Sequence, residues 1–274
     1  MTLTATSHDR LSAPPDAERR SGLMLALTLA AAAAWLVAIA AEVTGTGALL
    51  HHHALIEGGP LGAPPLWLAA VLAVASWQVM VAGMMVPASL PAIGVFERAS
   101  RALARPSLAL VGFIGAFALA WAGIGLAGFF GDYALHHIVD ATPWLEEHPW
   151  VIQSGTFALA GVYQLTSFKH RFLAACRHPT TAAAADSDGV VGVRAGWAHA
   201  LDCVGASGPL MLLMFAAGFA NLAWMAVLTG VMVYEARGRA GHRAALAFGV
   251  LLLAASVAAL ALGGLPGFEP AAAG

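Results

Sequence analysis

Charged residues are scarce in this sequence. They make up 10% of its 274 residues, against about 25% in ordinary soluble domains, whereas 59% of the residues are hydrophobic. A soluble chain of this length needs more polar surface, so the composition excludes a soluble enzyme and a disordered protein. The formal net charge of −2 provides no basic surface, which excludes nucleic acid as a partner.

Cysteines and catalytic motifs are also lacking. Two cysteines are too few for a disulfide scaffold. The sequence contains no His-Glu-x-x-His, no Gly-x-Ser-x-Gly, no P-loop and no Cys-x-x-Cys. Nothing in it therefore favours an enzyme.

Long apolar runs are abundant instead. Runs of about 20 apolar residues cross a hydrocarbon core of about 30 Å as α-helices. Seven such runs predict an all-α, polytopic transmembrane helix bundle. The expected spans are residues 23–41, 66–86, 107–130, 150–168, 195–217, 219–234 and 243–262. The fifth and sixth runs almost touch, which predicts a very tight helical hairpin.

The basic residues are sorted along the chain. Every Lys and Arg lies in the N-terminal segment or in the second, fourth or sixth connection, and the alternate connections contain none. The positive-inside rule then predicts a cytoplasmic N-terminus and an external C-terminus. Because a wrong number of spans would scatter these residues over both sides, the sorting also favours seven spans.

Three regions follow from this topology. Residues 1–21 are expected to be a disordered cytoplasmic tail, 22–265 a transmembrane helical domain and 266–274 a short external tail. Residues 180–192 are expected to be a flexible cytoplasmic loop. Residues 38–40 (Ala-Ile-Ala) have the pattern of a signal-peptidase site, but the preceding apolar run is long, which favours an uncleaved first helix.

The connections predicted outside the membrane hold histidines and acids but no cation. His51, His52 and His53 follow the first span, and His136 and His137 follow the third among several acids. Imidazole and carboxylate groups suit copper, zinc or nickel ions. The alternative is that polar loops simply hold polar residues.

The second span combines methionines with prolines. Met80 and Met84 share a helix face, Met85 is adjacent, and thioethers are soft ligands that suit Cu(I). Pro87 and Pro91 remove backbone donors, so a kink is expected that needs local rescue or serves a site. The alternative is that methionine fills the core and proline is merely common in membrane helices.

Ionisable residues inside the fifth span are the sharpest anomaly. His199, Asp202 and Cys203 lie in its cytoplasmic half, where ionisable groups are costly and indicate a functional site. Asp202 and His199 are three residues apart and could share a proton or a metal. Alternatively, both are solvated or hydrogen-bonded near the interface.

The fourth connection contains the other cysteine. Cys176 lies between His170 and His178 and could be a ligand or a free thiol. We favour the interpretation that this basic, amphipathic segment lies on anionic lipid.

Three stretches carry a family resemblance. They are residues 77–91 with Met-Met-x-Pro, 163–179 with Gln-Leu-Thr and Cys-Arg-x-Pro, and 196–235 with Cys203. In these stretches the chain resembles a bacterial family of unknown function, described as predicted metal-binding integral membrane proteins. The resemblance implies a multi-pass protein of the bacterial cytoplasmic (inner) membrane.

The chain departs from this family pattern at several cysteines. The resemblance places a cysteine where this chain has Phe172, and a pair of cysteines at Ala206 and Ser207. Cys176 and Cys203 match the pattern. If the family's thiols form its metal site, this chain retains only part of it.

The first hypothesis is a membrane protein that binds or handles a transition metal, copper before zinc or nickel, and delivers it to or supports another membrane protein. The outer histidines would collect the ion, and the Met, His, Asp and Cys side chains of the spans would hold it. The alternative is a non-catalytic structural or assembly subunit of a larger membrane complex. A transporter or enzyme that uses Asp202 and His199 ranks last.

Overall fold

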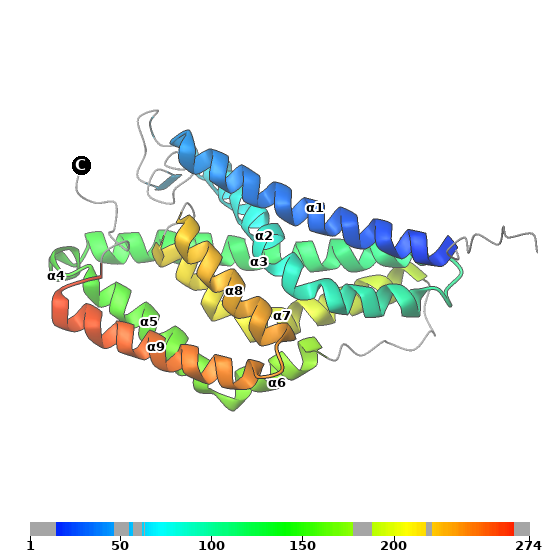
Figure 1. Ribbon diagram of the computed structural model, residues 1–274. Helices are drawn as coiled ribbons and strands as arrows, with labels where there is room; N and C mark the ends of the chain where they lie inside the picture. The colour runs from blue at the N-terminus through cyan, green and yellow to red at the C-terminus, as the bar shows by residue number, and fades with distance from the viewer. Residues whose placement is uncertain are drawn as a thin grey trace, which may run out of the picture.

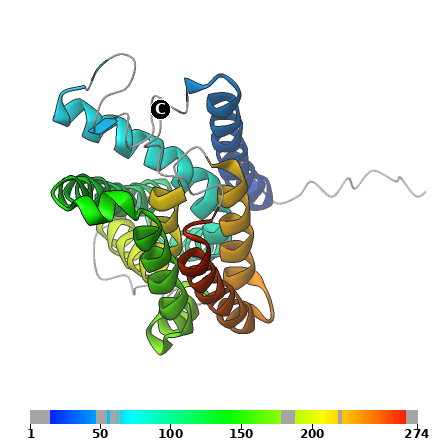
Figure 2. The same ribbon diagram turned by 90° about the vertical axis from the view of Figure 1, so that its left-hand side faces the viewer.

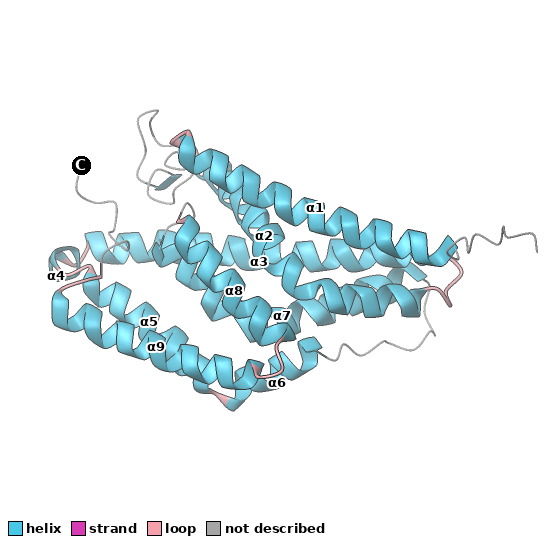
Figure 3. Cartoon of the chain, viewed as in Figure 1, coloured by secondary structure: helices cyan, strands magenta, loops and turns pink. Residues whose placement is uncertain are grey.

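The computed structural model describes residues 15–46, 55–56, 62, 64–177, 188–217 and 221–265 of the chain. The secondary structure in these ranges is almost entirely α-helical (Figure 3), which confirms the all-α class. The helices are α1 (Pro15–Val43), α2 (Leu66–Ser100), α3 (Pro106–Asp140), α4 (Pro143–Glu147), α5 (Trp150–Leu165), α6 (Ser167–Arg177), α7 (Asp188–Ala217), α8 (Leu222–Arg237) and α9 (Gly241–Leu262).

The long helices form an up-and-down bundle. In Figure 1, α1, α3, α7 and α9 run from right to left, and α2, α5 and α8 run back. Helix α3 packs along α7, α5 along α9, and α1 along α2. In the end view of Figure 2, α1 and the α5–α9 pair lie on opposite flanks. The ends that carry the basic residues therefore gather at one end of the bundle.

Each of the seven expected spans overlaps one of the long helices, but their lengths differ, and the expected span 150–168 runs past the end of α5 at Leu165 into α6. Four segments among the described residues are long and apolar enough to cross a membrane: Gly22–Val43, Leu66–Ser100, Pro106–Asp140 and Gly241–Leu262. Helices α5 and α8 have 16 residues each, which is a rise of about 24 Å. Leucines and valines of α1 and α9 point outward, as expected of helices that face lipid.

Two helices begin inside segments expected to be irregular. Helix α1 begins at Pro15, within the expected tail, because Pro at a first helical position and the following Asp16 and Glu18 are typical of a helix start. Helix α7 begins at Asp188, within the expected loop at 180–192. The rest of that loop and the expected hairpin turn lie outside the described residues.

Helix α2 continues through both of its prolines and is rescued locally at the first. Pro87 cannot donate to the carbonyl of Gly83. The indole Nε1 of Trp35 on α1 donates to that carbonyl instead, at 3.2 Å. A side chain from a neighbouring helix thus satisfies the freed acceptor, which is one of the two outcomes expected for this segment.

Helix α7 is fixed to its neighbours at two places. Pro209 frees the carbonyl of Gly205, and the Tyr163 hydroxyl of α5 donates to it at 2.6 Å. Nearer its start, α7 approaches α3 so closely that a Cβ on Gly196 would overlap the backbone of Phe113. These contacts set the position of the α7 residues between them.

Candidate metal centre

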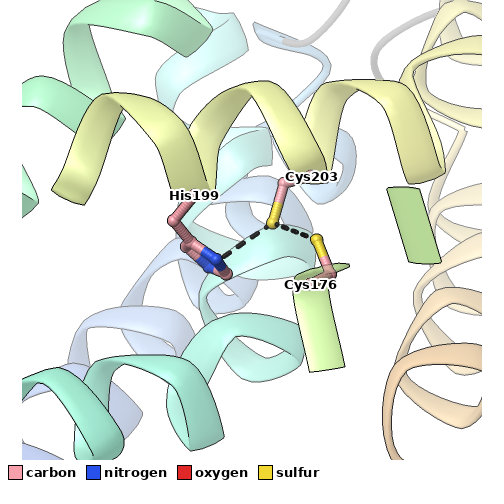
Figure 4. A group of neighbouring side chains, drawn as sticks. All are labelled: Cys176, His199 and Cys203. Atoms are coloured by element: carbon pink, nitrogen blue, oxygen red, sulfur yellow. Dashed lines mark hydrogen bonds between the residues drawn. The ribbon is translucent and has the colours of Figure 1, made fainter. Parts of the chain in front are cut away.

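The chain's two cysteines meet one histidine inside the bundle. His199 and Cys203 lie one turn apart on α7, and Cys176 lies near the end of α6 (Figure 4). The Cys176 Sγ donates a hydrogen bond to the Cys203 Sγ at 3.2 Å, and the Cys203 Sγ lies 3.4 Å from the His199 Nε2. The three possible ligand atoms all lie within 4.8 Å of one another.

The His199 ring is held in place by two aromatic rings of α3. Phe113 and Phe117 lie one turn apart on one face of that helix, and each stacks on the imidazole with ring centroids 5.7 Å apart. The His199 side chain is buried, and its Nδ1 has no hydrogen-bond partner among the described residues. The imidazole therefore presents its Nε2 to the thiols in a fixed orientation.

A buried ion pair anchors α6 beside α8. Lys169 and Glu235 are almost completely buried, and the Lys169 Nζ lies 2.7 Å from the Glu235 Oε2. The Gln164 Nε2 donates to the other carboxylate oxygen at 2.9 Å. Burial lowers the pKa of Lys169, and the Glu235 carboxylate opposes that shift. Because Lys169 and Cys176 share one short helix, the pair also places the thiol.

Arg177 makes a second attachment of α6 to α8. Its Nε donates to the backbone carbonyl of Glu235 at 3.0 Å, and its Nη2 donates to that carbonyl and to the carbonyl of Gly238 at 2.9 Å. These carbonyls belong to the last turn and the C-cap of α8, where a cation is favourable. Cys176, which directly precedes Arg177, is thereby held at the metal centre.

A small cavity adjoins the three donors. It has a volume of about 50 Å³, which exceeds the roughly 10–15 Å³ that one water requires. Cys176, His199 and Cys203 line this cavity. Two methionines, Met85 and Met232, and two charged residues, Arg177 and Glu235, also belong to its wall. The cavity can therefore admit a metal ion beside several sulfur atoms.

The donor set suits a soft ion of low coordination number. Thiolates select Cu(I) and zinc, and imidazole suits both. When three ligand atoms surround an ion in one plane, metal–ligand bonds of about 2.0–2.3 Å place these atoms about 3.5–4.0 Å from one another. The present distances of 3.2 and 3.4 Å are slightly shorter, so a shift of less than about 1 Å would open the three donors around an ion.

Proton release would accompany metal binding. The hydrogen bond to the Cys203 sulfur and burial both raise the pKa of the Cys176 thiol. At neutral pH this thiol is therefore protonated in the metal-free protein. An ion that binds its sulfur must displace that proton.

The expected residues of the spans are only partly brought together. His199 and Cys203 lie at the centre, and Met85 lies on the cavity wall. Met80 and Met84 are buried in the same core cluster but do not line the cavity. Asp202 is half-buried and is not part of the three-residue group. A metal-binding role for these three residues stays a prediction.

The expected outer histidines do not form a described metal centre. His51, His52 and His53 lie outside the described residues. The His136 Nδ1 lies 2.9 Å from the backbone oxygen of Asp132, and His137 packs edge-on against Tyr133. Neither belongs to a group of three ligand-type side chains among the described residues. Metal capture at this face also stays a prediction.

Cys176 is the member of the three-residue group that our favoured interpretation missed. A segment lying on lipid does not account for a helix whose Lys169 is fully buried or for a thiol in contact with Cys203. One feature of the sequence did point to it. The chain has only two cysteines, so a metal centre with two thiol ligands would have to use both of them.

One comparison with known proteins gives a match. A family model described as PpoB2, copper chaperone, matches residues 74–259, which is more than half of the chain. The matched range contains Cys176, His199, Cys203 and the helices that position them. No curated protein and no solved structure matches the chain.

Proposed function

This chain belongs to the PpoB2 copper-chaperone family, and we propose that it binds one Cu(I) ion with Cys176, His199 and Cys203 as the ligands. The observation that carries the proposal is the meeting of the chain's only two cysteines with a buried histidine. These cysteines come from different helices and are 27 positions apart in the sequence. A packing role alone does not require both thiols and an imidazole at one cavity.

The chemistry of the three donors favours Cu(I) over harder ions. Thiolate sulfur is the soft ligand that selects Cu(I), and aromatic and methionine side chains pack around the centre. No carboxylate belongs to the three-residue group, whereas magnesium and manganese prefer oxygen ligands, and the carboxylate on the cavity wall, Glu235, is paired with Lys169. Zinc is the main competitor, but it prefers four ligands.

We also propose that the seven long helices are seven membrane spans, with the N-terminus in the cytoplasm. The restriction of every Lys and Arg to the N-terminal segment and the second, fourth and sixth connections of the sequence supports this topology. The outward-facing leucines and valines and the four long apolar segments support a membrane location. The short α5 and α8 would span a locally thinned bilayer or be extended by their connections.

Delivery of the ion would proceed by ligand exchange. Cys203 and His199 are buried, whereas Cys176 is half-buried and near the basic end of the bundle. A ligand of the acceptor protein would therefore replace Cys176 first. The acceptor is proposed to be another membrane protein that takes the ion directly. Release into the cytoplasm would exchange the soft sulfur ligands of Cu(I) for water, which is unfavourable.

The test is a competition for copper. The full chain, purified in detergent without oxygen, is titrated with Cu(I) against a chromogenic Cu(I) chelator, and the thiolate-to-copper absorption is recorded. We expect Cys176→Ser and Cys203→Ser each to abolish that absorption. Thr229→Ala on α8 is the matched control, because its hydroxyl donates to the Met225 carbonyl one turn away, at 2.6 Å, and Thr229 does not line the cavity.

Two results would contradict the proposal. One is a wild-type protein that shows no thiolate-bound copper. The other is an unchanged copper absorption in both cysteine variants. Metal-free protein that co-purifies with a stable membrane partner would then favour the assembly-subunit alternative.

A further inference from the structure

A second pair of ligand-type side chains joins α6 to the start of α9. His170 of α6 and His242 of α9 are 72 positions apart, yet their Nδ1 atoms lie 2.9 Å apart and their ring centroids 3.9 Å apart. Figure 1 shows the start of α9 near α6. His242 is exposed, and His170 is half-buried.

The contact brings the Nδ1 atoms of the two rings together, while the rings themselves lie partly side by side with their planes tilted by 55°. Two nitrogens at 2.9 Å require one N–H donor and one lone pair, so both rings cannot be protonated at once. Burial, His242 and Lys169 all lower the pKa of His170. In this arrangement at least one of the two rings is neutral, and a neutral imidazole is a metal ligand.

Only two donors are present, and cations are their neighbours in the sequence. Lys169 and Arg171 flank His170, and Arg243 follows His242 at the positive end of α9. Among the described residues, no third His, Cys, Asp or Glu completes a group with this pair. Zinc and nickel ions require more than two ligands, and their double positive charge is unfavourable near these cationic side chains. Cu(I) carries a single charge and is stable with two nitrogen ligands in line.

We propose that His170 and His242 form a second Cu(I) site at the surface, through which the ion enters or leaves the buried centre. This step rests on the proposed function for its cargo. Two metal–nitrogen bonds of about 2.0 Å in line hold the nitrogens about 4 Å apart and the ring centroids about 6 Å apart, so the rings must turn and their centroids must separate by about 2 Å. The exposed His242 side chain has room to make that movement.

The position of the pair suits exchange with the buried centre. His170 and Cys176 are six residues apart on α6, which is about 9 Å along the helix axis. One site is accessible and has nitrogen donors, and the other is buried and has sulfur donors. An ion that favours sulfur would therefore pass from the histidine pair to the thiols without leaving this short helix.

The test counts Cu(I) at each site of the full chain in detergent, without oxygen, by mass spectrometry and X-ray absorption. The wild type should bind two ions. His242→Asn keeps a hydrogen-bond donor near the Nδ1 position but should lose one ion, and the Cys176→Ser/Cys203→Ser double variant should keep one ion with imidazole neighbours only. His148→Asn, a matched control at the other end of the bundle, should still bind two.

The outcomes separate the two proposals. A wild type with one sulfur-bound ion, unchanged in His242→Asn, would overturn the histidine site and leave the proposed function intact. One imidazole-bound ion that the cysteine substitutions do not affect would overturn the proposed function and leave the histidine site. Zn(II) that displaces Cu(I) from the pair in the double cysteine variant would also overturn the assignment to Cu(I).

Discussion

The buried pair of Lys169 and Glu235 allows a quantitative prediction, because both charges are removed from water. Their side chains are 0% and 2% exposed, and one contact of 2.7 Å joins them. Replacing Lys169 with Met leaves an unpaired buried carboxylate with only the Gln164 amide as a donor. Loss of one partner of a buried pair costs about 3–5 kcal/mol.

A double-mutant cycle isolates the interaction. Lys169→Met and Glu235→Gln should each destabilise the fold by about 3–5 kcal/mol, whereas the double variant, which buries no charge, should lose far less than their sum. The assay is loss of helical circular dichroism during titration of detergent micelles with sodium dodecyl sulfate. Arg239→Met is the control, because this exposed arginine should change stability by no more than about 0.5 kcal/mol.

The same variants report on the metal centre. If the pair places α6, either single substitution should also speed the reaction of Cys176 with a maleimide, because the helix that carries the thiol is released. Single variants within about 1 kcal/mol of the wild type, or additive effects in the double variant, would refute the anchoring role of the pair.

Three further predictions follow from individual contacts. Mild oxidation should join the two thiols, which lie 3.2 Å apart, with a loss of two hydrogen masses and of copper binding; binding that persists after the mass change contradicts this. Trp35→Phe should cost about 1–3 kcal/mol by leaving the Gly83 carbonyl unpaired, but much less in a Pro87→Ala background that restores the backbone donor; equal costs would refute the rescue. Gly196→Ala should separate α3 from α7 and weaken copper binding, whereas Gly123→Ala on α3, where a Cβ meets nothing within 4 Å, should not; equal effects would refute the close approach.

The helices were the most predictable part of the fold. Apolar runs determine which segments are helical, and each expected span overlaps a long helix. The helix starts at Pro15 and Asp188 were missed because hydropathy gives no weight to capping residues or to polar helical turns. The identity of the rescuing donors could not be predicted, because Trp35 and Gly83 are 48 positions apart.

The site was half predictable. His199 and Cys203 share a helix face at a spacing of four, which the sequence displays directly. Cys176 meets them only because Lys169 and Arg177 attach α6 to α8, and the sequence does not show which acid pairs with which base. The contact between His170 and His242 could not be predicted either, because neither residue lies in an apolar run.

X-ray absorption at the copper edge is the most direct test of the central claim that Cys176, His199 and Cys203 hold Cu(I). The full chain is loaded with less than one equivalent, so that the tightest site fills first. The account predicts two sulfur neighbours at about 2.3 Å and one imidazole nitrogen at about 2.0 Å. A spectrum with only nitrogen and oxygen neighbours at that loading would contradict it.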